Sequence, residues 1–177
     1  MTTTTLDPAL LPPAESPIDF PVPVIPDRRI KKKFRRQMVE FDGTEEPGTL
    51  VVDPDNRYLY HVLAYGSAMR YGVGVGRPGF EWGGALTVSN KREWPDWTPP
   101  AQMIKRRPDL PRHMAGGPEN PLGARAMYLG ASIYRIHGTA QPWTIGMNIS
   151  SGCIRMLNED VIDLFNRVPV GATVVVI

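Results

Sequence analysis

The chain has 177 residues and a mass of 19.7 kDa, which corresponds to one ordinary domain with a tail. Hydrophobic residues make up 42% and charged residues 21%, a balance that excludes a wholly disordered chain. The 19 prolines and 17 glycines argue against a bundle of long helices and favour short strands joined by turns. Because there is one cysteine, no intramolecular disulfide can form.

The net charge of +2 is unevenly distributed along the chain. Residues 1–36 hold seven basic and four acidic residues, whereas the remainder holds 13 basic and 14 acidic residues. This nearly neutral body gives no support to a nucleic-acid-binding domain. No apolar run approaches the ~18–20 residues of a membrane-spanning helix. Met1 is not followed by the charged and apolar regions of a secretory signal, so we expect that any export signal has been trimmed.

Residues 1–36 are expected to form an N-terminal arm or linker. Seven prolines fall within residues 1–26, and such a segment favours extended conformations that bury little. The basic run RRIKKKFRR follows. We interpret it as a solvated tether, with the alternative that it holds the protein to an anionic surface or polymer.

Residues 37–177 are expected to form one mainly β domain. Alternating and β-branched patterns predict strands at MVEF, TLVVD, RYLYHVL, AMRYGVGVG, GALTVS, MYLG, ASIYRIHG and GATVVVI, the last of them buried. The turn PDN joins the second and third of these into a β-hairpin. NEDVIDLFNRV predicts one helix, with Asn158 as its N-cap and Pro169 as its stop. The fold class is therefore a mixed β-sandwich or barrel with one C-terminal helix packed on it.

Residues 90–121 have no hydrophobic period and are rich in proline, so we expect a long loop insertion there. Loops of this length inside a compact domain are uncommon and tend to be functional.

The single thiol and a nearby imidazole are the candidates for chemistry. Cys153 lies in SSGCIRM, where Gly152 permits a tight turn, and His137 lies in YRIHGT at the end of a predicted strand. A thiol and an imidazole together can form a nucleophile activated by a base. The alternatives are a small buried hydrophobic residue and a hydrogen-bonded core histidine. The histidines and the cysteine lack the spacing of metal ligands, so no metal or other cofactor is expected: His61, His113, His137 and Cys153.

These segments together resemble the active-site signature of the L,D-transpeptidases, the YkuD-type catalytic domain. The resemblance rests on His137-Gly138-Thr139, Pro142, Ile145-Gly146 and SSGCIRM, with twelve residues between His137 and Ser150. GTLVVDPDNRYLYHVL, NPLGARAMYL and the C-terminal helix and strand also resemble family segments, so the resemblance covers about residues 36–177. Many members have histidine where this chain has Ser151, and the long insertion resembles that of proteobacterial members with cell-envelope roles.

The resemblance implies a role for each residue of the signature. Cys153 would be the nucleophile, His137 its base, and the carbonyl of Gly138 the group that orients the imidazole. Backbone N–H groups around Gly152 and Cys153 would form the oxyanion hole. The hydroxyl groups of the two preceding serines would give polar support: Ser150 and Ser151.

Substrate contacts are expected from five further residues: Arg155, Tyr134, Trp82, Trp94 and Trp97. Arg155 would bind a substrate carboxylate or, alternatively, make a structural hydrogen bond or ion pair behind the site. Tyr134 would contact substrate or only pack. The tryptophans would form a wall or lid that contacts a mixed sugar–peptide ligand, or would simply anchor the insertion to the sheet.

The resemblance implies that the thiolate attacks the bond between diaminopimelate at position 3 and D-Ala at position 4 of a peptidoglycan stem tetrapeptide. D-Ala would leave, and an amine would then take the acyl group from the thioester. The acceptor would be a diaminopimelate amine (3→3), a position-1 amine (1→3), a free D-amino acid or an envelope protein. Such an enzyme acts in the periplasm and is a target of carbapenems.

Three alternative functions remain at this point. With water as acceptor the enzyme would be an L,D-carboxypeptidase. A non-catalytic peptidoglycan-binding domain of the same fold would not need the intact Cys153 and His137 pair. A cysteine peptidase or amidase of unrelated fold would, in its papain-like version, place cysteine before histidine, whereas the order here is reversed.

Overall fold

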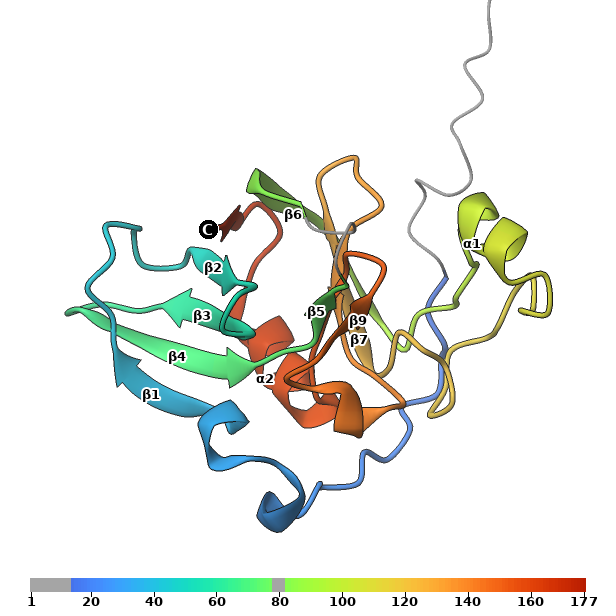
Figure 1. The fold of residues 1–177 in the computed structure, drawn as a ribbon, viewed down its shortest axis with the longest axis horizontal. Helices are drawn as coiled ribbons and strands as arrows, with labels where there is room; N and C mark the ends of the chain where they lie inside the picture. Colours follow the sequence, from blue (N-terminus) through green and yellow to red (C-terminus); the bar gives the residue numbers. More distant parts are fainter. Residues whose placement is uncertain (1–13, 78–81) are drawn as a thin grey trace, which may run out of the picture.

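The computed structural model describes residues 14–77 and 82–177 and is mainly β (Figure 1). The described strands are β1 (Gln37–Glu40), β2 (Leu50–Asp53), β3 (Tyr58–Val62), β4 (Ser67–Gly72), β5 (Val75–Gly76), β6 (Gly84–Glu93), β7 (Arg125–Leu129), β8 (Arg135–His137), β9 (Asn148–Ser150), β10 (Ile154–Arg155) and β11 (Thr173–Val176). The α-helices are α1 (Ala101–Arg106) and α2 (Asn158–Arg167), and short 3-10 turns lie at Asp27–Arg29, Lys32–Phe34 and Pro142–Thr144.

Nine of the described strands form one sheet in the order β1-β4-β3-β2-β11-β6-β7-β8-β10, while β5 and β9 pair separately. The predicted hairpin is confirmed, because β2 and β3 are antiparallel with Leu50 opposite His61. The C-terminal strand β11 lies inside the sheet, parallel to β2 and antiparallel to β6. Its burial is less complete than expected, since only Val174 within it is fully buried. The chain's last strand therefore joins the two halves of the sheet.

Helix α2 lies between the half of the sheet that contains β1–β4 and the half that contains β6 and β7 (Figure 1). Its apolar face carries Val161 and Leu164, which are 0% exposed. They belong to a single core with Leu50 and Leu59 from one half of the sheet and Met127 from the other. One helix thus covers the inner face of a curled sheet, which confirms the expected fold class.

The predicted insertion differs from the structure at its start. Strand β6 continues to Glu93, because Asn90–Glu93 pair with β7, with Glu93 opposite Arg125. That partner lies about thirty residues further along the chain, so no local pattern could reveal the extension. A short helix, α1, occupies part of the remaining segment. The strand predicted over AMRYGVGVG is also divided into β4 and β5, because Gly74 between them pairs with Arg155 instead.

The C-terminal part of the arm packs against the sheet. Phe34 is 5% exposed, and a side chain at Gly72 or Gly146 would collide with it. Arg36 pairs with Asp163 of α2 at 3.3 Å, so at least this member of the basic run binds the body of the protein. The basic run is therefore attached at its end to both the sheet and α2.

Replacing Phe34 with alanine should destabilise the domain by about 3–5 kcal/mol, the usual cost of removing a buried aromatic ring. Met38 is 55% exposed and serves as the control, since Met38→Ala should change stability by no more than about 0.5 kcal/mol. Urea unfolding followed by circular dichroism measures both. Equal midpoints for the two variants would show that the arm adds nothing to the core.

Candidate active site

The reactive side chains are brought together by two adjacent strands. β8 and β10 are parallel, with Ile136 opposite Ile154 and His137 opposite Arg155. Because side chains alternate between the faces of a sheet, the buried isoleucines point to the core. The residues on either side of them then share the opposite face, and all four line one cavity of about 460 Å³: Cys153, Arg155, Arg135 and His137.

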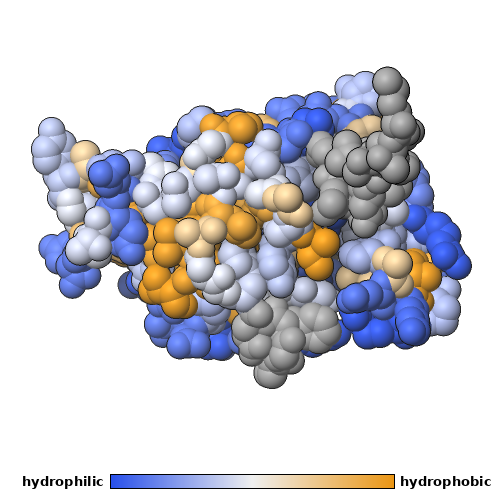
Figure 2. Space-filling view, turned by 90° about the horizontal axis from the view of Figure 1, so that it is seen from above, coloured by the Kyte–Doolittle hydropathy of each residue, from blue (hydrophilic) through white to orange (hydrophobic). Residues whose placement is uncertain are grey.

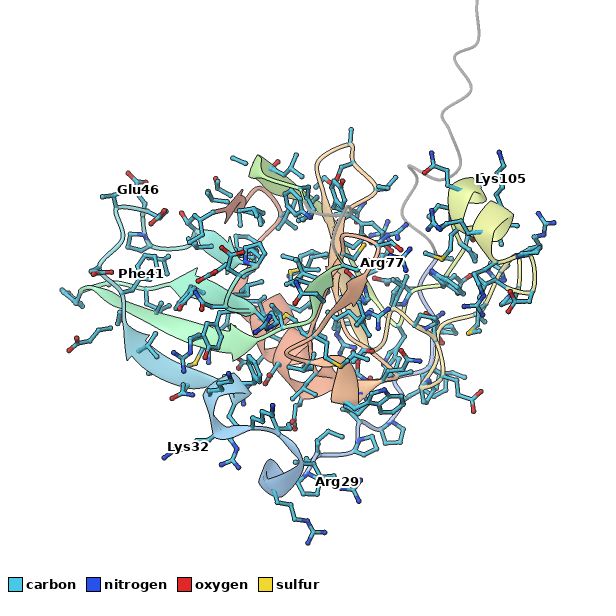
Figure 3. All side chains as sticks on the ribbon, in the orientation of Figure 1. Arg29, Lys32, Phe41, Glu46, Arg77 and Lys105 are labelled. Atoms are coloured by element: carbon cyan, nitrogen blue, oxygen red, sulfur yellow. The ribbon has the colours of Figure 1, made fainter. Side chains whose placement is uncertain are left out.

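The opposite wall of this cavity comes from the insertion. Its lining residues there are Trp97, Pro100, Met103, Arg106, Arg107 and Leu110. Five arginines but only one glutamate, Glu119, line the cavity as a whole. Figure 3 shows one of these arginines, Arg77, near the centre of the molecule, and Lys105 pointing outward from α1. In Figure 2 the end of the visible face that carries α1 is mostly hydrophilic. The cavity is therefore positively charged and suited to a ligand that bears carboxylates.

His137 is held in one tautomer by the carbonyl next to it. It is 5% exposed, and its Nδ1 lies 2.5 Å from the carbonyl oxygen of Gly138. A carbonyl oxygen only accepts hydrogen bonds, so Nδ1 carries the proton and Nε2 keeps a lone pair. Burial lowers the pKa of His137 to about 3, and the guanidinium of Arg155 acts in the same direction. The imidazole is therefore neutral at neutral pH and able to accept a proton at Nε2.

Cys153 is a neutral thiol in the resting site. Burial raises the pKa of its thiol, and the nearby guanidinium of Arg135 offsets part of that increase. The Sγ atom lies 3.8 Å from the carbonyl oxygen of Ile133, which can accept a weak hydrogen bond from it. A neutral thiol thus shares the cavity with a neutral imidazole, instead of a preformed thiolate–imidazolium pair.

The turn before Cys153 is shaped by Ser150 and Gly152. The Ser150 hydroxyl donates to the carbonyl of Cys153 at 2.6 Å and accepts from the N–H of Gly152 at 3.2 Å. Gly152 has a φ of +109°, a conformation that residues with side chains rarely adopt. Both serines line the cavity, but Ser150 is buried and its hydroxyl bonds to the backbone.

Trp82 and Tyr134 contact the same turn without lining the large cavity. The indole N–H of Trp82 donates to the carbonyl of Gly152 at 2.8 Å, and its ring stacks on Tyr134 with centroids 4.8 Å apart. Both rings thus support the turn that presents Cys153. Tyr134 packs on Trp82 in this structure.

The two tryptophans of the insertion have different environments. Trp97 lines the cavity, although it is only 7% exposed. Trp94 is 1% exposed, and its indole N–H donates to Asp19 of the arm at 3.0 Å. Trp94 is therefore a packing residue and not a substrate contact, because its ring is covered and does not reach the cavity.

Arg155 makes a hydrogen bond within the protein and also lines the cavity. One of its terminal nitrogens donates to Gln141 Oε1 at 3.3 Å, and its Nε is buried without a hydrogen-bond partner. The residue also lines the cavity. A carboxylate of a bound ligand could pair with the part of the guanidinium that lines the cavity.

Sequence reasoning missed the role of Asn158, which was predicted to be a helix N-cap. In the structure Leu157 is at the cap position and Asn158 begins α2. The Asn158 Oδ1 accepts hydrogen bonds from the backbone N–H groups of Ala124 at 3.0 Å and Thr139 at 3.1 Å. It therefore holds the segment after His137 against the start of β7. Arg135 was also missed, although its place two residues before His137 on a strand puts both on one face.

Asn158→Ser separates the two roles of this residue. Serine is as good an N-cap as asparagine, so a capping role predicts almost no change. The serine hydroxyl is too short to replace Oδ1, so two buried N–H donors would lose their acceptor, at a cost of about 1–3 kcal/mol each. Thermal unfolding measures the loss. Asn158→Asp keeps the acceptor and should lose much less, and equal stability of all three proteins would contradict the bridging role.

The neutral state of the Cys153 and His137 pair predicts a simple pH dependence of thiol labelling. Because the pKa of Cys153 is raised, the thiolate fraction should rise about tenfold per pH unit from pH 6 to pH 9, with no step near pH 6.5. The rate of iodoacetamide labelling, followed by mass spectrometry, reports this fraction. His137→Ala should leave the shape of the profile unchanged. A plateau between pH 5 and pH 8 that disappears in His137→Ala would instead reveal a thiolate–imidazolium pair.

Two searches of the described residues gave no further site. No helix in residues 14–77 or 82–177 has the length and hydrophobicity needed to cross a membrane. Within the same ranges, no group of three or more His, Cys, Asp or Glu side chains is arranged to hold a metal ion.

Comparison with known proteins agrees with this geometry. The sequence model of the L,D-transpeptidase catalytic domain family, YkuD, matches residues 47–177. Among curated proteins, the probable L,D-transpeptidase ErfK/SrfK of Escherichia coli K12 is 36% identical over 149 residues, which cover 80% of this chain and 47% of that protein. This chain thus spans about half the length of the curated relatives that it matches.

Solved structures share the fold. One from Brucella melitensis, named as a probable carnitine operon oxidoreductase, is 52% identical, with a TM-score of 0.56 over 84% of this chain and 96% of that one. An L,D-transpeptidase from Mycobacterium smegmatis has a TM-score of 0.58 over 73% of this chain and 58% of its own, and at 17% identity it shows the fold alone. With the family match extending over residues 47–177, the chain belongs to the L,D-transpeptidase catalytic domain family.

Proposed function

We propose that this chain is a cysteine-dependent peptidoglycan L,D-transpeptidase in which Cys153 carries the acyl group and His137 transfers the protons. The observation that supports this most directly is that His137, at the end of β8, and Cys153, immediately before the adjacent β10, line one cavity, with the His137 Nδ1 proton held by Gly138. The free Nε2 lone pair is then the only proton acceptor that the imidazole offers.

The first half of the reaction acylates the thiol. The Cys153 proton passes to His137 Nε2 as the sulfur forms a bond to the carbonyl carbon between diaminopimelate and D-Ala. The carbonyl oxygen becomes an oxyanion, for which we propose the Cys153 N–H as donor, because that of Gly152 already donates to Ser150. The C–N bond then breaks, D-Ala leaves with the proton from His137, and a thioester remains.

The second half transfers the acyl group. An acceptor amine attacks the thioester carbonyl and gives its proton to His137, the C–S bond breaks, and the proton returns to the sulfur. The product is an amide that links the donor to the acceptor. With water in place of the amine the same steps would release a tripeptide, which is the L,D-carboxypeptidase alternative. The acceptor is a second diaminopimelate stem, a position-1 amine, a D-amino acid or an envelope protein.

The charge of the cavity supports a stem peptide as donor. Such a peptide carries several carboxylates, and the cavity is lined by five arginines and one glutamate. We propose that Arg155 binds one of these carboxylates through the nitrogen atoms that face the cavity. Trp97, Pro100 and Met103 supply apolar surface on the opposite wall. Because this substrate lies outside the cytoplasm, we propose a periplasmic location.

The proposal is tested by incubating the protein with purified disaccharide-tetrapeptide and identifying the products by mass spectrometry. The wild type should release D-Ala and form a cross-linked dimer, whereas Cys153→Ala should form neither. His137→Ala should lose at least about 100-fold in rate, the usual contribution of a general base. Met38→Ala is the control, because that side chain is exposed and lies outside the cavity.

A carbapenem provides an independent measurement. It should add one drug mass to the intact wild type and to Met38→Ala, but none to Cys153→Ala. Tripeptide without a dimer would favour the carboxypeptidase. Binding to peptidoglycan without products or drug labelling would favour the non-catalytic domain.

A further inference from the structure

The N-terminal arm is paired with the start of the insertion. Glu15 and Pro95 form an antiparallel bridge. The N–H of Ser16 donates to the carbonyl of Trp94 at 3.0 Å, and the N–H of Asp96 donates to the carbonyl of Ala14 at 2.9 Å. The arm therefore adds a short extended segment to the base of the insertion.

Side chains of the arm strengthen this pairing. Asp19 Oδ1 accepts the indole N–H of Trp94 at 3.0 Å, and the ring of Phe20 meets the indole edge-on with centroids 5.1 Å apart. Glu15 Oε1 also accepts the N–H of Glu93 at 3.0 Å. Three residues of the arm thus bind the end of β6 and the tryptophan that follows it.

Trp94 needs such support, because its backbone is in an unfavourable conformation. Its φ is +43°, a region that bulky residues rarely occupy, and such a conformation persists only where the surroundings impose it. The N–H of Trp94 donates to the carbonyl of Ala124 at 2.7 Å, which holds it from the side of the sheet. The arm holds the same residue from the other side, so the direction in which the insertion leaves β6 depends on both.

The residues that follow Trp94 connect it to the wall of the cavity. Asp96 accepts hydrogen bonds from His113 Nε2 at 2.9 Å and from the N–H of Gly116 at 3.1 Å. Trp97 and Met114 exchange two backbone hydrogen bonds of 2.7 and 2.8 Å. Helix α1, which follows, has no buried residue of its own. The wall therefore has few contacts beyond its base with which to keep its position.

We propose that residues 14–20 form a brace that determines substrate specificity: by holding Trp94 and Asp96, they set the distance between the insertion's wall and the strand that carries Cys153. The wall contributes Arg106 and Arg107 to the cavity, so its position decides how a carboxylate-bearing peptide is bound. The part of this inference that concerns substrate rests on the proposed function. The part that concerns the wall does not.

The test uses three substitutions in the full chain. Asp19→Ala removes the acceptor of the Trp94 indole, and Asp19→Asn keeps an oxygen at the same place. Val24→Ala is the matched control, because Val24 lies in the same arm and is 77% exposed. Hydrogen exchange of the 97–119 peptides measures the mobility of the wall, steady-state kinetics with disaccharide-tetrapeptide separates KM from kcat, and iodoacetamide measures the reactivity of Cys153.

Asp19→Ala should raise exchange in the 97–119 peptides at least threefold and raise KM three- to tenfold, with kcat and the labelling rate within twofold of the wild type. Asp19→Asn and Val24→Ala should behave as the wild type. Unchanged exchange in Asp19→Ala would overturn the proposal. A joint decrease of kcat, labelling rate and melting temperature would also overturn it, because that is the result of a merely stabilising contact.

A second variant keeps the test decisive if Asp19→Ala folds poorly. Trp94→Phe removes the indole donor from the other partner and should give the same increases in exchange and KM. The double variant Trp94→Phe with Asp19→Asn should match Trp94→Phe alone, because Trp94→Phe already removes the donor of this hydrogen bond. If the wild type shows no turnover, the proposed function fails, while the exchange measurements still decide whether the arm holds the wall.

Discussion

The chemistry of this domain depends on a parallel pairing of only two residue pairs, Ile136 with Ile154 and His137 with Arg155. The two isoleucines are buried in the core, so a shift of one residue would turn them outward and carry Cys153 to the wrong face. Two contacts extend the pairing. The N–H of Met156 donates to the carbonyl of His137 at 2.8 Å, and Gly74 exchanges two 2.9 Å hydrogen bonds with Arg155.

The environment of the cavity shifts the pKa values of Cys153 and His137 in opposite directions. Burial opposes charge on both, which raises the pKa of Cys153 and lowers that of His137. Arg135 favours the thiolate but opposes the imidazolium, as does Arg155. The resting pair is consequently neutral, and in the mechanism that we propose the two groups become charged only as the sulfur attacks a carbonyl. A neutral thiol also reacts slowly with oxidants.

The cavity is built from segments that are far apart in the chain. One side of it has more packing contacts than the other. The side of the cavity that carries His137 and Cys153 packs on the core through β7, β8 and α2. Asn158 of α2 also binds the backbone just before β7 and just after His137. The insertion side rests on Trp94 and Trp97 at its base and on the arm, which packs against Trp94. The catalytic pair that we propose thus lies on the side packed against the core, whereas the proposed substrate selection lies on the side with fewer contacts.

The sequence by itself determined the hairpin of β2 and β3 and the amphipathic helix α2, because each has a local signature of period or turn chemistry. It indicated the segments that hold Cys153 and His137 through their resemblance to the family's signature. Several features required the tertiary structure. Asn90–Glu93 are a strand because β7 lies beside them, and Asn158 is a bridge because Ala124 and Thr139 bring donors to it. Trp94 packs under the arm while Trp97 faces the cavity, although both occur in the same proline-rich segment. These outcomes depend on contacts with residues that are distant in the chain. The local sequence around a hydrogen-bond acceptor or an aromatic ring does not indicate which distant residue it will contact.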